Sequence, residues 1–234
     1  MNKHHARRWF FVVVYAAAMA WVEAAVVFYL RKMVNRIEPY QATPLPEFGG
    51  IGPAEMVREF ATMIMLLTVG WLAGQTRRAR LGYCLLAFGV WDILYYVFLK
   101  VLTGWPRGVF DWDLLFLLPL PWWGPVLAPV CIALLMILWG TAVTQFEWSQ
   151  PARAESRRAW ALAAVGAATA LYAFMTDAIR VVGQGGEKIR NVLPQNFNWP
   201  LFLLALLLMA APVVAAWRRI RASAPTALPE PECN

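Results

Sequence analysis

Six apolar runs, each about as long as a bilayer is thick, constrain this chain more than any other feature. They lie near residues 9–30, 55–73, 81–101, 123–145, 159–181 and 199–217. A helix needs about 20 apolar residues to cross the hydrocarbon core. A helix also satisfies all of its backbone hydrogen bonds internally, as hydrocarbon requires. The sequence therefore predicts an all-α bundle of about six transmembrane helices.

Composition supports a polytopic membrane protein. The 234-residue chain is 60% hydrophobic and 15% charged, whereas a soluble domain carries about 25% charged residues. The net charge of +7 comes from short basic clusters between the apolar runs, a placement that indicates topology rather than a nucleic-acid surface. We expect membrane lipid as a partner and no nucleic acid.

The first apolar run could be confused with a secretory signal. Lys3, Arg7 and Arg8 precede it, and Ala16 to Ala20 supply small residues of the kind found at cleavage sites. The run nevertheless continues to Leu30, which is longer than the hydrophobic region of a signal peptide. We interpret it as an uncleaved first span.

The distribution of basic residues predicts the orientation. With the N-terminus inside, the inner segments hold twelve Lys and Arg and the three longer outer loops hold seven. Positive charge concentrates on the cytoplasmic side of membrane proteins. We therefore expect both termini to face the cytoplasm of a bacterial inner membrane, with one transmembrane domain over residues 1–221 and a disordered tail over 222–234.

Residues 105–123, between the third and fourth spans, are rich in Trp, Phe and Leu and are interrupted by Pro106, Pro119 and Pro121. Such a segment suits the outer membrane interface, either lying along it or re-entering the bilayer. Asp111 and Asp113 precede a leucine-rich stretch and are interpreted as helix N-caps.

Acidic residues occur in the outer halves of four spans and are absent from the inner halves. A carboxylate in hydrocarbon costs about 2.5–3.5 kcal/mol on insertion scales, so each needs a partner or a function. We predict that they converge on one cluster beneath residues 105–123 and supply its catalytic groups. These four residues are Glu23, Glu59, Asp92 and Asp177.

Helical spacing adds further side chains to the predicted cluster. Asp92 and Tyr96 are four residues apart and share a face. Asp177 can reach a basic residue three positions on. The predicted substrate-binding residues are Arg58, Trp91, Tyr95, Tyr96 and Arg180.

A structural explanation stays open for the same residues. Acid–base pairs between or within transmembrane helices often only stabilise packing, and charged residues near span ends extend into the interface. The tyrosines can equally be packing residues.

Motifs of known chemistry are missing from the sequence. It contains no phosphate-binding loop, dinucleotide fingerprint, zinc-protease motif or nucleophile elbow. His4 and His5 precede the first span, and the three cysteines have no metal-ligand spacing. We expect no cofactor and no metal.

Several short patterns together resemble a family of uncharacterised bacterial multi-span membrane proteins. They are Arg58-Glu59-Phe60-Ala61-Thr62, Trp91-Asp92-Ile93-Leu94-Tyr95-Tyr96, Gly104-Trp105-Pro106, Asp111-Trp112-Asp113 and Pro121-Trp122-Trp123-Gly124-Pro125-Val126. The resemblance covers the first four spans and implies a six-helix inner-membrane protein. It implies no activity.

Three functions are compatible with the sequence. The first is a site for a lipophilic or amphipathic small molecule, with carboxylate acid–base chemistry if the protein is an enzyme. The second is a non-catalytic subunit or assembly factor of a membrane complex. The third is a proton- or cation-coupled transporter, although transport sites tend to lie near the bilayer midplane.

Overall fold

The computed structural model describes residues 3–36, 38–41, 51–116, 120–146, 157–185 and 192–222. Six helical spans in this part of the chain are long and apolar enough to cross a membrane, as expected for a multi-pass membrane protein. Most of the predicted tail, 223–234, lies outside the described residues. The helices are α1 (Lys3–Met33), α2 (Ile51–Ala73), α3 (Arg77–Thr103), α4 (Leu127–Gln145), α5 (Arg157–Val181), α7 (Trp199–Met209) and α8 (Ala211–Ala222).

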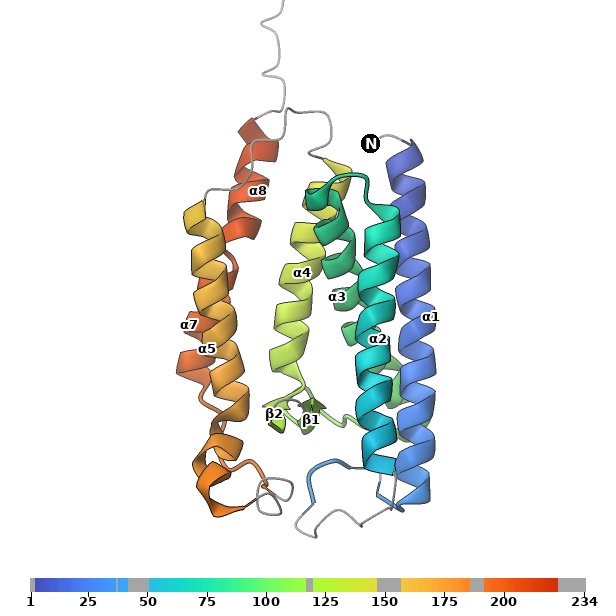
Figure 1. Ribbon diagram of the computed structural model, residues 1–234, viewed down its shortest axis with the longest axis vertical. Coiled ribbons are helices and arrows are strands. Elements are labelled where there is room, and N and C mark those ends of the chain that lie inside the picture. Colours follow the sequence, from blue (N-terminus) through green and yellow to red (C-terminus); the bar gives the residue numbers. More distant parts are fainter. Residues whose placement is uncertain are drawn as a thin grey trace, which may run out of the picture.

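The last predicted span is divided into α7 and α8, which follow one another in the same direction (Figure 1). Pro212 explains the division, because proline lacks the backbone N–H of a helical hydrogen bond and its ring crowds the carbonyl of the preceding turn. The start of α7 is capped, since the side chain of Asn198 accepts a hydrogen bond from the backbone N–H of Leu201 at 3.1 Å.

Helix α3 is the centre of the first part of the bundle, where it packs against α1, α2 and α4. The second part consists of α5, α7 and α8, and α4 contacts it through α8 and α7. Figure 1 shows the same arrangement, with α5 and α7 on the opposite side of α4 from α1 and α2. Residues on α1 to α3 therefore share an interior that α5 does not enter.

The contact between α3 and α4 depends on glycine. A Cβ placed on Gly140 of α4 would lie 2.5 Å from the carbonyl oxygen of Gly82 on α3. A Cβ on Gly89 would lie 2.6 Å from the carbonyl oxygen of Ala133. Small residues let transmembrane helices approach to backbone contact, so the two helices are held closely at two levels.

The aromatic segment contains a two-stranded antiparallel hairpin, which the all-α prediction did not include. Strand β1 (Trp112–Phe116) pairs with β2 (Trp122–Pro125), and Asp113 lies opposite Gly124. Because β2 takes up residues 122–125, α4 begins at Leu127 rather than near 123. The helix N-cap interpretation of Asp113 is therefore wrong, since Asp113 lies within a strand.

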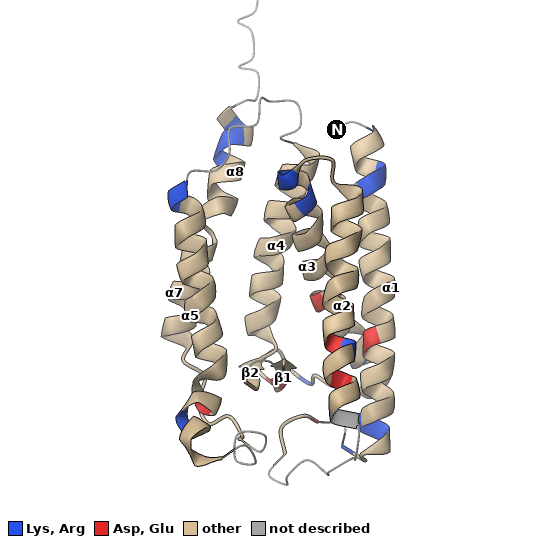
Figure 2. Cartoon of the chain, viewed as in Figure 1, with Lys and Arg blue, Asp and Glu red and all other residues tan. Residues whose placement is uncertain are grey.

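Charged side chains are unevenly distributed along the bundle. Figure 2 shows Lys and Arg near the start of α1, α3 and α5 and near the end of α8, all at the end of the bundle where the chain begins. The acidic positions of α1, α2 and α5 lie in the opposite half, which we call the far half, and that of α3 lies near the middle of the bundle. The hairpin also lies in the far half (Figure 1).

Candidate functional site

One group of charges joins α1 to α2. The guanidinium of Arg58 forms ion pairs with the carboxylates of Glu23 on α1 and Glu55 on its own helix, the latter at 2.8 Å. The hydroxyl of Thr62 donates a hydrogen bond to Glu23 at 3.3 Å. Glu23 is buried, and its charge is thus neutralised by a neighbouring helix. This group fits the structural explanation of helix packing.

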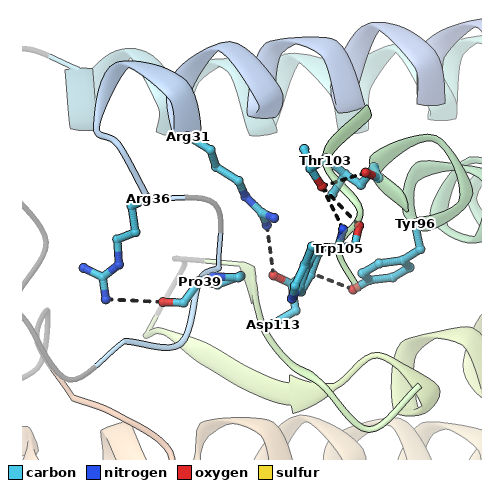
Figure 3. Close-up of polar contacts among 8 residues, drawn as sticks. Arg31, Arg36, Pro39, Tyr96, Thr103, Trp105 and Asp113 are labelled. Atoms are coloured by element: carbon cyan, nitrogen blue, oxygen red, sulfur yellow. Dashed lines mark hydrogen bonds and ion pairs between the residues drawn. The ribbon is translucent and has the colours of Figure 1, made fainter. Parts of the chain in front are cut away.

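A second group joins the hairpin to α1 and α3 (Figure 3). The hydroxyl of Tyr96 donates a hydrogen bond to one carboxylate oxygen of Asp113 at 3.1 Å. The guanidinium of Arg31 lies 3.5 Å from the other oxygen and 4.3 Å from the ring centre of Trp105. Burial raises the pKa of Asp113 to about 6, although Arg31 and Tyr96 act in the opposite direction. Asp113 thus links three elements at one point.

Asp92 differs from the other three predicted acids in its immediate surroundings. Its residue is 9% exposed, and among the described residues nothing forms a hydrogen bond to its buried Oδ2 atom. The neighbouring Nε1 atom of Trp91 is also buried and has no acceptor in this part of the chain. Asp92 lies within electrostatic range of Asp113, which is also an acid, so the two carboxylates repel one another when both are ionised. A buried carboxylate oxygen without a partner is costly, so it calls for a ligand, a water molecule or a proton.

Aromatic residues precede and follow Asp92 on α3. The rings of Trp91 and Tyr95 are stacked with their centres 6.2 Å apart, and the centre of Tyr96 is 5.1 Å from that of Tyr95. Tyr95 lies within electrostatic range of both charged groups, including Glu23 and Asp113. We call Asp92 with Trp91, Tyr95, Tyr96 and Asp113 the Asp92 site.

Asp177 does not belong to this site. It pairs with Arg180 on its own helix at 3.2 Å, and the side chain of Arg180 is 60% exposed. Helix α5 packs on α7, α8 and β2, and Figure 2 shows its acidic position far across the bundle from those of α1 and α2. The prediction that all four spans contribute to one cluster is therefore wrong for α5. The acidic position of α5 lies toward the same end of the bundle as those of α1 and α2. The depth of a residue along its helix does not show which other helices that helix contacts.

Glu59, the remaining predicted acid, is half-buried on α2, next to Arg58 in the sequence. It takes part in an interaction in the structure, so it is not a free carboxylate. Its place on α2 associates it with the Glu23–Arg58 group rather than with Asp92.

Sequence reasoning missed Asp113, the most deeply buried acid of the site at 3% exposure. A leucine-rich stretch after an aspartate is as compatible with the start of a helix as with the strand that the structure shows. The available signal was the proline content of residues 105–123, since Pro119 and Pro121 exclude a long helix there. A short strand that ends before the prolines would then have been the alternative.

An open pocket of about 420 Å³ lies near the site at the outer surface of the far half. Asn35, Glu38 and Gln41 line one side, and the turn after α3, including Trp105, lines the other. The buried ring of Trp105 lies 6.2 Å from that of Tyr96. The pocket is therefore separated from the Asp92 site by one layer of aromatic side chains.

The described segments contain no group of three or more His, Cys, Asp or Glu side chains placed to hold a metal ion. No protein-family model matches the sequence, and no curated protein or solved structure matches it. The resemblance to uncharacterised bacterial membrane proteins stays a prediction.

Proposed function

We propose that this chain is a multi-pass protein of a bacterial inner membrane that binds a lipophilic or amphipathic small molecule at Asp92, in the outer half of the bundle. The observation that carries the proposal is the buried Oδ2 atom of Asp92, which has no hydrogen-bond partner among the described residues. A residue that served only to hold helices together would have its partner on a neighbouring helix, as Glu23 has in Arg58.

The surroundings of Asp92 support a ligand of mixed character. Ligand sites are mostly apolar, with a few polar groups that fix orientation. Trp91 and Tyr95 supply apolar and aromatic surface, while Asp92 and Asp113 supply the polar groups. If the protein is an enzyme, Asp92 is the group for general acid or base catalysis, because it is the acid not committed to a cation.

The orientation proposed from the sequence fits the distribution of charge. Lys and Arg cluster at the end of the bundle that contains the start of α1 and the end of α8 (Figure 2). Under the positive-inside rule this end faces the cytoplasm. Under this orientation we expect lipophilic compounds of the periplasmic side to approach the Asp92 site from the outer leaflet.

The charge distribution is less favourable for the transporter alternative. A carrier needs polar groups along a route through both halves of the membrane, whereas the acidic side chains of the described helices lie in the far half or near the middle of the bundle. The subunit alternative makes a different prediction from ours, namely that Asp92 contacts a partner helix rather than a small molecule.

The test compares Asp92→Asn with Asp177→Asn, which is the same chemical change in an ion pair outside the site. Each full-length variant is purified from native membranes in mild detergent, and its bound small molecules are identified by native mass spectrometry. We expect the wild type and Asp177→Asn to retain a lipophilic compound that Asp92→Asn has lost. Equal retention by both variants would refute the proposal, as would co-purification of a stoichiometric partner protein lost only from Asp92→Asn.

A further inference from the structure

We infer that the Asp92 site selects a molecule with a positively charged group, so that the ligand is a lipophilic or amphipathic cation. This inference rests on the proposed small-molecule site and specifies its ligand class. It follows from the charges and ring faces around Asp92.

The guanidinium groups of Arg58 and Arg31, which belong to the two charged groups described above, both pair with carboxylates. Arg58 pairs with Glu23 and Glu55. Arg31 pairs with Asp113 and lies over the ring of Trp105. Neither guanidinium has Asp92 as a partner.

Acidic groups therefore outnumber basic groups around the site. Asp92 lies within electrostatic range of Asp113, and the one guanidinium paired with Asp113 among the described residues is that of Arg31. The excess falls at Asp92, since Asp113 has Arg31 as its ion-pair partner and Asp92 has no ion-pair partner among the described residues. A cation placed there completes the pairing, whereas an anion would meet Asp92 and Asp113 and be repelled.

The unpartnered Oδ2 atom is an observation independent of this count of charges. It is buried on α3 and lies close enough to Asp113 for the two carboxylates to interact. An ionised carboxylate oxygen only accepts hydrogen bonds, so the partner that Oδ2 lacks in the ionised state is a donor or a positive charge.

The aromatic side chains favour the same sign of charge. Trp91, Tyr95 and Tyr96 form a continuous series of rings on the helix that carries Asp92, and Tyr96 lies within electrostatic range of Asp92. The face of an aromatic ring is negative and attracts cations, most strongly for Trp and Tyr and in sites shielded from water. These rings also provide apolar contact for the rest of an amphipathic molecule.

The outer pocket offers a route to the site. Its volume of about 420 Å³ falls within the range of about 300–1,000 Å³ typical of small-molecule sites. Trp105 forms part of its wall and packs against Tyr96. Displacement of the Trp105 ring would connect the pocket to the aromatic rings beside Asp92.

Two hydrophobic ions of nearly equal size and opposite charge test the inference: tetraphenylphosphonium and tetraphenylborate. Their binding to the full-length protein in phosphatidylcholine nanodiscs is measured by isothermal titration calorimetry, with empty nanodiscs as the blank. We expect tetraphenylphosphonium to bind at least tenfold more tightly than tetraphenylborate. Asp92→Asn is expected to weaken tetraphenylphosphonium binding at least tenfold, and Asp177→Asn to leave it unchanged.

The outcomes separate this inference from the proposed function. Equal binding of the two ions, or tighter binding of tetraphenylborate, would overturn the cation selectivity and leave the small-molecule site in place. Binding of neither ion would overturn both. The comparison of the two ions uses the wild type alone, so it decides the inference even if Asp92→Asn does not fold.

Discussion

Replacing Gly124 with alanine tests how the hairpin is positioned over the site. Gly124 lies in β2 opposite Asp113, and a Cβ at this position would be 2.7 Å from a ring carbon of Phe174 on α5. Carbon atoms in contact normally stay about 3.5–4.0 Å apart. The hairpin or the ring must therefore move by about 1 Å to restore ordinary contact.

The ring of Phe174 has little room to move. It is 5% exposed, and its centre lies 5.7 Å from that of Phe197 and 5.6 Å from that of Phe202. Overpacking of this kind costs about 1–3 kcal/mol. The smaller unfolded-state entropy of alanine offsets about 0.4–1 kcal/mol, so the net loss falls between about 0 and 2.6 kcal/mol.

A double-mutant cycle isolates the contact. Thermal unfolding in detergent is followed for Gly124→Ala, Phe174→Leu and the double variant. We expect a lower midpoint for Gly124→Ala, by about 2–4 °C per kcal/mol, and a smaller effect of the same change once Phe174→Leu has removed the ring. Gly183→Ala is the control, since a Cβ there has no neighbour within 4 Å. A stabilised Gly124→Ala, or additive effects in the cycle, would refute the reasoning.

Three further predictions concern packing and charge. Gly140→Ala separates α3 from α4 and lowers the unfolding midpoint more than Gly183→Ala; equal midpoints would contradict the tight contact. Glu23→Gln removes one partner of Arg58, and we expect it to lower the free energy of chemical unfolding by about 1.5–3 kcal/mol. Asp177→Asn, whose partner is exposed, should lower it by less than about 1 kcal/mol. Equal losses in the two variants would contradict the difference in burial. The raised pKa of Asp113, about 6 against 3.8, means that the folded protein binds the proton more tightly, so the unfolding free energy rises as the pH falls from about 6 toward 4. Asp113→Asn lacks this rise, and parallel pH profiles of the unfolding midpoint would show that Asp113 is not the group responsible.

The spans were predictable because each apolar run is both long and bounded by charged or turn-forming residues. Thr76 and Gly104, for example, mark the two ends of α3: the side chain of Thr76 accepts a hydrogen bond from the backbone N–H of Ala79, and Gly104 adopts φ of 76°, which glycine tolerates best. The break before Pro212 was not predicted, because residues 199–217 form one continuous apolar run in the sequence. Caps and glycines of this kind act on residues a few positions away in the chain, so they can be recognised from the sequence alone.

The site was only partly predictable, because its residues come from elements that sequence periodicity does not place side by side. Helical spacing correctly puts Asp92 and Tyr96 on one face of α3. It contains no information on which helix that face contacts, so Asp177 was wrongly included. Asp113 was missed because its strand has only five residues, and its importance depends on pairing with Arg31, which lies far away in the sequence.

The most direct test of the central claim, that Asp92 is the ligand-contacting carboxylate, is labelling with dicyclohexylcarbodiimide followed by peptide mapping. This reagent is lipophilic and adds to a protonated carboxyl group, whose oxygen bonds to the central carbon of the carbodiimide while its proton passes to a nitrogen. A nearby cation keeps a carboxylate ionised and so protects it from the reagent. We expect the adduct at Asp92 and reduced labelling when tetraphenylphosphonium is bound, while Glu23 and Asp177 stay unmodified in their ion pairs. An unmodified Asp92, or labelling of Asp177 to the same extent, would contradict the account.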